Sequence, residues 1–388
     1  MTIPPIPATT PATTPSNAPF YCPDIADIEA GETCQMKRWF QAEHEGNGII
    51  KADALPETHM KFQLLQDLRL VSEMPEIDAA TITKMLQASL DELPPEVRTN
   101  PKMMELVYRR LGMVAAYALY KEPVIRTLWE TVLTPADVIL ERDPLWVILH
   151  PGRLLKCRRT GELLYREFLH IPAGFIHTQW LRGQAYNMRI HATMIALEND
   201  LGEKLAGKPI QESQVTGLGE GYRSGVSGRL MHPYVWAARN LTTGEWRRDI
   251  PLTGNEGWVG APVWEFPDGI VQWVLKLGET VATSLFPISS PFKRDTMKVA
   301  QWAGSILRRE REIGTNLAAC QGNLHLRSTI FHRTTTACSP GVGSPCPFTD
   351  ACWKPSLTHD PIKDGIYIKA SSLTVLKATP AKEVVVTA

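Results

Sequence analysis

The sequence predicts an α/β protein built on one central β-sheet. Three observations predict this class. Helical periodicity dominates 57–133, short apolar segments separated by DP, PG and TG turn signals fill 137–171, and longer helical segments return from 177 onward with strand-like stretches between them. This order of helices, strand meander, long helix, strand and helices favours a mixed central sheet flanked by helices.

The first part of the chain is expected to be helical. The stretch ETHMKFQLLQDLRLV, 57–71, carries apolar side chains at helical spacing, namely Met60, Leu64, Leu65, Leu68 and Val71. Two longer helices are expected at 78–93 and 101–122, because the segment PPEVRTNP between them breaks a helix. The segment VIRTLWETVL, 124–133, predicts a further short helix.

A run of strands is expected next. The segments DVILER, LWVILHP, GRLLKC and ELLYREFLHI, within 137–171, predict an antiparallel meander. One long amphipathic helix is expected over 177–202, with Gly202 as its C-cap. Strands are expected within 208–221 and 232–241, and helices within 266–286 and 293–317.

Composition limits the classes of function. The chain has 388 residues with 41 basic and 41 acidic side chains, so any contact with nucleic acid must come from a local patch. No run of eighteen apolar residues is present, and we expect no membrane span. Residues 1–20 are rich in Pro and Thr and lack a basic, apolar leader, which predicts a disordered tail and a cytoplasmic protein.

Three cysteines lie close together near the end of the chain, in CSPGVGSPCPFTDAC, at Cys338, Cys346 and Cys352. The seven cysteines and the missing secretion signal favour a metal site over disulfides. Cys34 is the preferred fourth ligand because it precedes a short helix, and Cys22 is its competitor.

Four thiolates suit either a [4Fe–4S] cluster or Zn²⁺, and such a site would join the N- and C-terminal parts of the chain. The alternative interpretation is that these cysteines are small buried hydrophobes.

The cysteine pattern around CPF resembles the iron–sulfur branch of the PD-(D/E)XK nuclease superfamily, which includes RecB-like nuclease domains and CRISPR-adaptation nucleases. PETH, ending at His59, resembles the family's first motif, and GRLLKC, RRTGE and LLYREFLHI resemble its two catalytic strands and their turn. The following helix, with Trp180 and Gln184, resembles the post-motif helix. Later segments, WEFPDGIVQWV, LFPISSPF and ILRREREI, extend the similarity over roughly 31–355.

The resemblance implies a restriction-endonuclease-like core over 21–355, with a helical insertion at about 75–130 and a C-terminal extension at 356–388. It also implies the [4Fe–4S] form of the cysteine site. In the family, two carboxylates bind Mg²⁺, a lysine positions the nucleophile, and these groups project from adjacent strands at one sheet edge.

The chain departs from this pattern at two positions. Leu155 stands where the first strand motif has its Asp, and Leu169 stands where the second has its Lys. His59 and Glu167 remain, and together they offer too few oxygens for Mg²⁺. Other acids able to replace the lost carboxylate are Glu130, Asp137, Glu141, Asp143 and Glu162.

We therefore expect a nucleic-acid-binding protein with lost or strongly reduced cleavage, acting on DNA single strands or ends or scaffolding a partner in a replication, recombination or defence complex. Gln184 is a candidate contact by resemblance, and Lys156, Arg158 and Arg159 at the hairpin turn are candidate phosphate ligands.

Two other functions remain open. One is an active nuclease whose catalytic carboxylates lie at other positions. Of the functions considered, this one alone would require Mg²⁺. The other is a metal-stapled scaffold that binds no nucleic acid. The segment GLGEGYRSG, 217–225, is expected to be a turn, because Tyr222 breaks GxGxxG and no GK[ST] follows.

Overall fold

The structure is a computed structural model. It describes residues 49–51, 55–133, 137–142, 145–171, 177–202, 204–205, 207–219, 221–223, 230–248, 257–320, 338, 346, 348, 351–352, 362 and 366–369. The tail predicted at 1–20 and the two early cysteines lie outside these residues.

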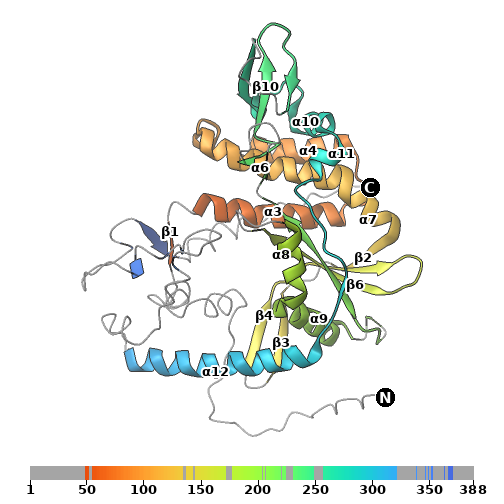
Figure 1. Cartoon of the computed structure of the whole chain (residues 1–388), viewed down its shortest axis with the longest axis vertical. Coiled ribbons are helices and arrows are strands. Elements are labelled where there is room, and N and C mark those ends of the chain that lie inside the picture. Colours follow the sequence, from red (N-terminus) through yellow and green to blue (C-terminus); the bar gives the residue numbers. More distant parts are fainter. Residues whose placement is uncertain are drawn as a thin grey trace.

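A five-stranded mixed sheet forms the centre, with strand order β13-β7-β6-β5-β2 (Figure 1). Its strands are β2 (Trp129–Leu133), β5 (Arg153–Cys157), β6 (Leu163–His170), β7 (Glu212–Leu218) and β13 (Phe292–Lys293). β6 and β7 are parallel, and the other neighbouring pairs are antiparallel. The predicted mixed central sheet flanked by helices is confirmed.

The parallel pair needs a crossover connection, which helices supply. Between β6 and β7 lie α8 (His177–Gly183), the 3₁₀ turn η5 (Gln184–Tyr186) and α9 (Met188–Leu201). The single long helix predicted over 177–202 is wrong, because Asn187 has extended backbone and its side-chain oxygen accepts a hydrogen bond of 3.1 Å from the amide of Arg189. This cap starts a new helix.

Two other sequence expectations need correction. Residues 129–133 form the edge strand β2 rather than the end of a helix, since they pair antiparallel with β5. Among the described strands, β3 (Val138–Arg142) and β4 (Leu145–Leu149) pair with each other in a separate two-stranded sheet. β3 packs against α9, so the predicted meander is divided between two sheets.

One face of the central sheet is covered by two groups of helices, one before β2 in the chain and one after β12. They are α3 (Leu55–Glu73), α4 (Ala79–Asp91), α5 (Pro95–Arg98), α6 (Pro101–Ala116), the π-helical turn η4 (Tyr117–Lys121), α7 (Glu122–Leu128), η6 (Val263–Glu265), α10 (Gly269–Leu277) and α11 (Glu279–Ala282). Their buried side chains share one core with Leu155, Leu164 and Phe168 of the sheet. We call this the α3 face.

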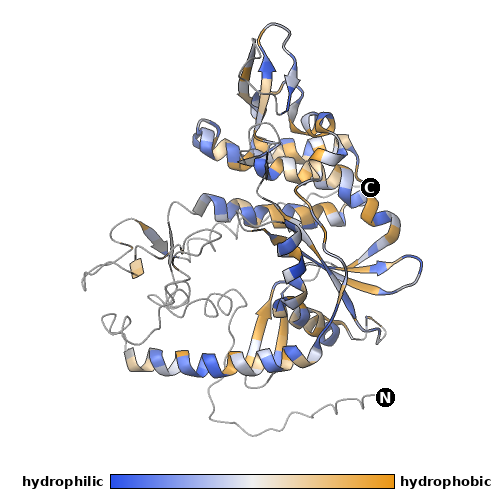
Figure 2. Ribbon diagram, in the orientation of Figure 1, coloured by the Kyte–Doolittle hydropathy of each residue, from blue (hydrophilic) through white to orange (hydrophobic). Residues whose placement is uncertain are grey.

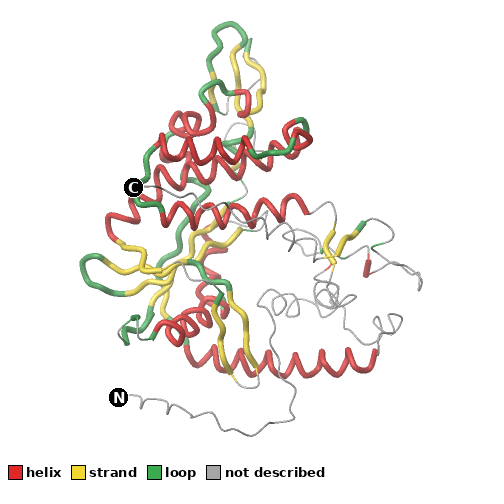
Figure 3. Tube along the Cα trace, turned by 180° about the vertical axis from the view of Figure 1, so that it is seen from behind, coloured by secondary structure: helices red, strands yellow, loops and turns green. Residues whose placement is uncertain are grey.

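The opposite face packs on the β3–β4 hairpin, α9 and α12 (Thr296–Cys320). Leu154, Tyr165 and Val215 belong to this second core, and we call this the α9 face. Figure 2 shows the apolar strands of β3 and β4 beside the largely hydrophilic α12. Seen from behind in Figure 3, the sheet lies between the two helical layers.

The remaining strands form small sheets. β10 (Trp236–Asn240) pairs with β11 (Trp246–Arg247) and with β12 (Trp258–Pro262), and β8 (Tyr222–Arg223) pairs with β9 (Leu230–Met231). β1 (Ile49–Lys51) pairs with β14 (Tyr367–Lys369), which joins an early and a late part of the chain. None of the described helices has the length and apolar character needed to cross a bilayer.

Candidate functional site

The β5–β6 hairpin positions the residues that the family resemblance singles out. Its turn closes with the Cys157 amide donating to the Glu162 carbonyl at 2.8 Å, and Gly161 adopts φ 72° there. Gly152 precedes β5, and an added Cβ at this position would lie 2.2 Å from the Arg166 carbonyl oxygen. Glycine at 152 therefore permits the close approach of the two strands.

The register of the hairpin decides which side chains share a face. Leu155 pairs with Leu164, and Leu154 pairs with Tyr165. Because side chains alternate along a strand, Leu155 lies on the α3 face while Glu167 and Leu169 lie on the α9 face. In β5, Leu154 lies on the α9 face with Glu167 and is fully buried. The structure therefore does not bring Leu155 and Glu167 together.

Glu167 is buried on the α9 face with 4% of its surface exposed. The Tyr165 hydroxyl donates a short hydrogen bond to Glu167, and the Gly152 amide donates to the Tyr165 oxygen at 2.9 Å. Burial raises the pKa of the Glu167 carboxyl, against the opposing effects of the Arg189 charge, the Tyr165 hydrogen bond and the Arg69 charge. Burial, followed by the nearby Glu167 charge, also raises the pKa of Tyr165. Burial thus opposes ionisation of Glu167, while two arginine charges favour it.

The environment of Glu167 does not suit a hard cation. Ca²⁺ and Mg²⁺ require several oxygen ligands, usually ionised carboxylates, carbonyls and water. Within the described part of the chain, no three His, Cys, Asp or Glu side chains are gathered as a set of metal ligands. The other candidate acids that the structure describes are exposed, namely Glu130, Asp137, Glu141 and Glu162, whereas Asp143 lies outside the described residues.

His59 and Gln184 have separate surroundings. His59 is half-buried on α3, and burial followed by the Arg110 charge lowers its pKa. Arg69, which influences Glu167, lies ten residues further along α3, about 15 Å away along the helix axis. The Gln184 amide donates to the Trp180 carbonyl at 3.3 Å and accepts from Asn187 at 3.0 Å. Gln184 thus stabilises the α8–α9 junction.

The basic turn, defined as Lys156, Arg158 and Arg159, is exposed. The Arg158 amide donates to the Leu128 carbonyl at 2.9 Å, and its Nε donates to the Arg126 carbonyl at 2.8 Å. Because one hydrogen bond fixes its backbone and another fixes Nε of its guanidinium, Arg158 presents its terminal nitrogens in a defined direction. A groove of about 400 Å³ beside it includes Arg126 and Trp129 in its wall.

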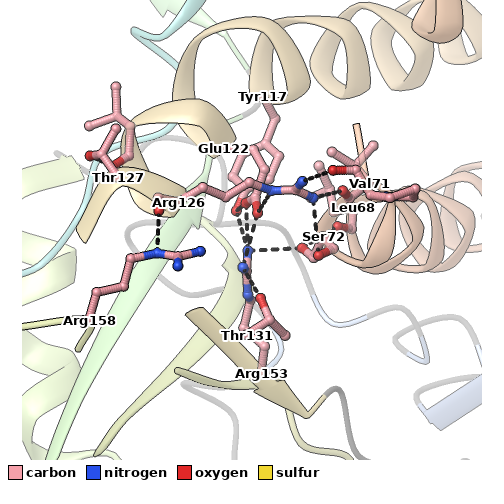
Figure 4. Close-up of polar contacts among 12 residues, drawn as sticks. Leu68, Val71, Ser72, Tyr117, Glu122, Arg126, Thr127, Thr131, Arg153 and Arg158 are labelled. Carbon is pink, nitrogen blue, oxygen red and sulfur yellow. Dashed lines mark hydrogen bonds and ion pairs between the residues drawn. The ribbon is translucent and has the colours of Figure 1, made fainter. Parts of the chain in front are cut away.

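A buried polar network occupies the α3 face beneath this groove (Figure 4). Arg153 donates to both oxygens of Glu122, at 2.6 and 3.1 Å, and to the hydroxyls of Ser72, Tyr117 and Thr131, at 2.9, 3.1 and 2.6 Å. Tyr117 donates to Glu122 at 3.0 Å. We call this group the Arg153 network.

Arg126 joins the Arg153 network to the end of α3. Its Nε donates to Glu122 at 3.0 Å, and its Nη2 donates to the Val71 carbonyl at 3.0 Å. Glu122 therefore faces two guanidinium groups while being fully buried. Paired in this way, the buried carboxylate satisfies the general requirement that interior charges be compensated.

The late cysteines lie in sparsely described sequence. The Cys346 amide donates to the Cys338 carbonyl at 3.2 Å, and the Cys352 amide donates to the Phe348 carbonyl at 2.8 Å. Phe348 stacks on Tyr367 with ring centroids 6.0 Å apart, so this loop contacts the β1–β14 pair through Tyr367. The described cysteines do not by themselves form a metal centre, and the predicted fourth ligand, Cys34, lies outside the described residues.

Sequence reasoning missed the Arg153 network and the Arg69 and Arg189 charges around Glu167. The sequence does carry a signal for the Arg153 network. An arginine within the apolar strand segment GRLLKC needs an acidic partner if it is buried. No local pattern identifies Glu122 as its partner, since 31 positions separate them. No family model matches the chain, and no curated protein matches it.

Proposed function

We propose that this chain is a nucleic-acid-binding protein related to the iron–sulfur PD-(D/E)XK nucleases, and that it has lost or nearly lost cleavage. The ligand is DNA, as single strands or ends. The observation that carries the proposal is the state of Glu167 on the strand that resembles the family's second motif. It is a buried carboxyl that accepts a hydrogen bond from Tyr165 and has the charges of Arg189 and Arg69 nearby.

The order of elements supports the relationship. Antiparallel strands carry the two motif-like segments, helices follow, and β7 returns parallel to β6. The loss of cleavage is supported by the chemistry of the α9 face. A single buried carboxyl, flanked by Leu154 and Leu169 and with its pKa raised by burial, supplies too few oxygens for Mg²⁺.

Binding is assigned to the basic turn and the groove beside it. Arg158 is held in place by its hydrogen bond to Arg126, and Trp129 offers an aromatic ring in the groove wall. Cations that contact phosphates together with an aromatic ring that stacks on a base are the usual elements of single-strand binding. The chain's balanced net charge is compatible with such a local patch.

The proposal includes a [4Fe–4S] cluster on Cys34, Cys338, Cys346 and Cys352, with Zn²⁺ as the alternative. Its support is the donor chemistry, since four thiolates hold either group, and the backbone contact between Cys346 and Cys338. We expect about four irons and four sulfides per chain purified without oxygen, and their loss in Cys346→Ser. One zinc without sulfide would favour the alternative, and absence of any metal would contradict both.

Salt-dependent binding tests the function. We expect the chain to bind a labelled single strand, with a log Kd that depends linearly on log salt concentration. Replacing Lys156, Arg158 and Arg159 by alanine should reduce that slope by about two, if each contacts one phosphate. The matched control replaces Lys84, Lys102 and Lys276, which are exposed on helices of the α3 face. No binding, or equal slopes in both triple variants, would contradict the proposed surface.

A further inference from the structure

The small sheet formed by β11, β10 and β12 projects from the helices of the α3 face, at the top of Figure 1. Its strand order is β11-β10-β12, so β12 lies at one edge and, among the described strands, pairs with β10 alone. An edge strand presents a row of backbone N–H and C=O groups to which another strand can bind. We call Trp258–Pro262 the β12 edge.

Two backbone hydrogen bonds fix which groups of β12 point away from β10. The Val263 amide donates to the Val235 carbonyl at 2.8 Å, and the Leu241 amide donates to the Gly257 carbonyl at 2.7 Å. Five regular residue pairs lie between these bonds. Because hydrogen-bonded and non-hydrogen-bonded pairs alternate along an antiparallel ladder, the odd-numbered residues of β12 bond to β10. The even-numbered residues direct their backbone groups outward.

The outward groups belong to Trp258, Gly260 and Pro262. Proline has no N–H, so the β12 edge offers two donors, at Trp258 and Gly260, and three carbonyl acceptors. Gly260 is exposed, and a glycine has almost nothing but backbone to expose. A glycine inside a strand often marks a site where another backbone approaches closely. The centre of the β12 edge is therefore open to a second strand.

The edge strand of the central sheet, β2, has features that oppose such pairing. It carries the charged Glu130, and its register with β5 shifts between Thr131 and Leu133. Charged side chains and bulges are the usual means by which proteins protect an edge strand. The β12 sequence, WVGAP, contains no charged residue, and its register with β10 is regular. By these two criteria the β12 edge is unprotected.

The hydrogen-bonding pattern of the β12 edge is complementary to itself. In an antiparallel alignment centred on Gly260, each Gly260 amide donates to the Gly260 carbonyl of the other copy. Each Trp258 amide donates to the Pro262 carbonyl of the other copy. Both outward donors of each copy thus have an acceptor, and the missing N–H of Pro262 costs no donor. Such an arrangement has two-fold symmetry, with the same surface on both sides.

The side chains on one face of the sheet fit this alignment. Trp236 pairs with Pro262, is 45% exposed, and packs against Trp264 with ring centroids 5.9 Å apart. The alignment places Trp258 of the second copy on the other side of Pro262. Because side chains of paired residues lie on the same face, the two tryptophans would enclose the proline ring. The exposed apolar surface of Trp236 would then be covered.

The opposite face also joins a larger side chain to a smaller one. Val259, which is 37% exposed, lies opposite Ala261 of the second copy. Arg239, the partner of Val259 in β10, has its guanidinium 5.7 Å from the ring centroid of Trp246 in β11. Since β11 lies on the far side of β10, this charge is directed away from the β12 edge.

We propose that two copies of this chain associate through the β12 edge, so that their small sheets join into one continuous sheet across a two-fold axis. A second copy is the occupant because one alignment satisfies both outward donors and places each larger side chain beside a smaller one. The association uses backbone groups and apolar side chains, so it is independent of the proposed nucleic-acid function and is measured without nucleic acid.

Sedimentation velocity of the full chain tests the proposal. One strand pair forms a small interface, so the measurement covers about 1–100 μM chain. The dimer fraction should rise with concentration. Val259→Lys places two like charges diagonally across the joined strands and should raise the dimer Kd at least about tenfold. Val132→Lys is the matched control, because Val132 of the β2 edge strand is 41% exposed and receives the same charge.

Gly260→Pro is the second variant. It removes the central N–H donor of each copy and keeps the hydrogen bonds to β10, because the Gly260 amide points outward. It should also raise the dimer Kd at least about tenfold, with a thermal unfolding midpoint close to that of wild type. A wild-type chain that stays monomeric would overturn the proposal. So would a Kd unchanged in both β12 variants, or raised equally by Val132→Lys.

Discussion

On the α3 face of the β5–β6 hairpin, Arg153 hydrogen-bonds a carboxylate and three hydroxyl groups, whereas on the α9 face Glu167 accepts a side-chain hydrogen bond from Tyr165. Arg153 and Glu167 are both almost completely buried. The first is charged and extensively paired, whereas burial raises the pKa of the second. One step along the strand separates a face on which a buried ion pair joins the sheet to the helices from a face on which burial opposes ionisation.

This difference shows that the buried polar groups on the two faces of the sheet have different structural roles. The Arg153 network ties β5 to α3 and α7 through directional contacts, which fixes how the helices cover the sheet. The hydrogen bonds that join Gly152, Tyr165 and Glu167 lie within the β5–β6 hairpin itself. We therefore expect substitutions on the α3 face to affect stability most, and substitutions on the α9 face to affect it least.

The largest effect is expected from Glu122→Ala. This change leaves Arg153 buried without its counter-charge, and the free energy of unfolding should fall by about 3–5 kcal/mol. Urea denaturation measures it, with Glu130→Ala on the exposed side of β2 as a control that changes stability by less than about 0.5 kcal/mol. A loss in Glu122→Ala no larger than in the control would break the comparison.

An effect of intermediate size is expected in acid from His170, the last residue of β6. His170 has a folded pKa of about 4, below its ordinary value of 6.5, so the native state binds fewer protons than the unfolded state. Stability is therefore full above pH 6.5 and should fall by about 3 kcal/mol as pH decreases toward 4. His170→Asn should flatten this part of the pH profile. An unchanged profile would show that His170 is not buried as a neutral ring.

The smallest change is expected from Glu167→Gln. The folded pKa of Glu167 is raised, so the wild-type protein loses stability as pH rises through the unfolded value, 4.5, toward the folded one. Glutamine removes this penalty and retains an acceptor for Tyr165. The variant should gain stability relative to wild type between pH 4.5 and 8, by less than Glu122→Ala loses. A clear loss at pH 8 would instead indicate an ionised, well-paired Glu167.

The sequence predicts the β5–β6 hairpin well, because apolar segments at 152–157 and 162–171 flank a turn that contains a glycine. It does not predict that Leu155 and Glu167 occupy opposite faces, since that depends on the register set by the turn at Gly161. The segment 129–133 continues a helical pattern locally and becomes a strand only because β5 pairs with it. His170 and His232 are far apart in the chain, and only the tertiary fold brings both to one pocket.

The central claim is that the chain binds a nucleic acid and leaves it intact. The most direct measurement incubates a 5′-labelled single strand with the protein in Mg²⁺ and in Mn²⁺, and follows bound and cleaved strand in the same samples. The account predicts a retained strand of full length, in wild type and in Glu167→Ala alike. Cleavage by wild type that disappears in Glu167→Ala would contradict it by showing a working metal site at Glu167.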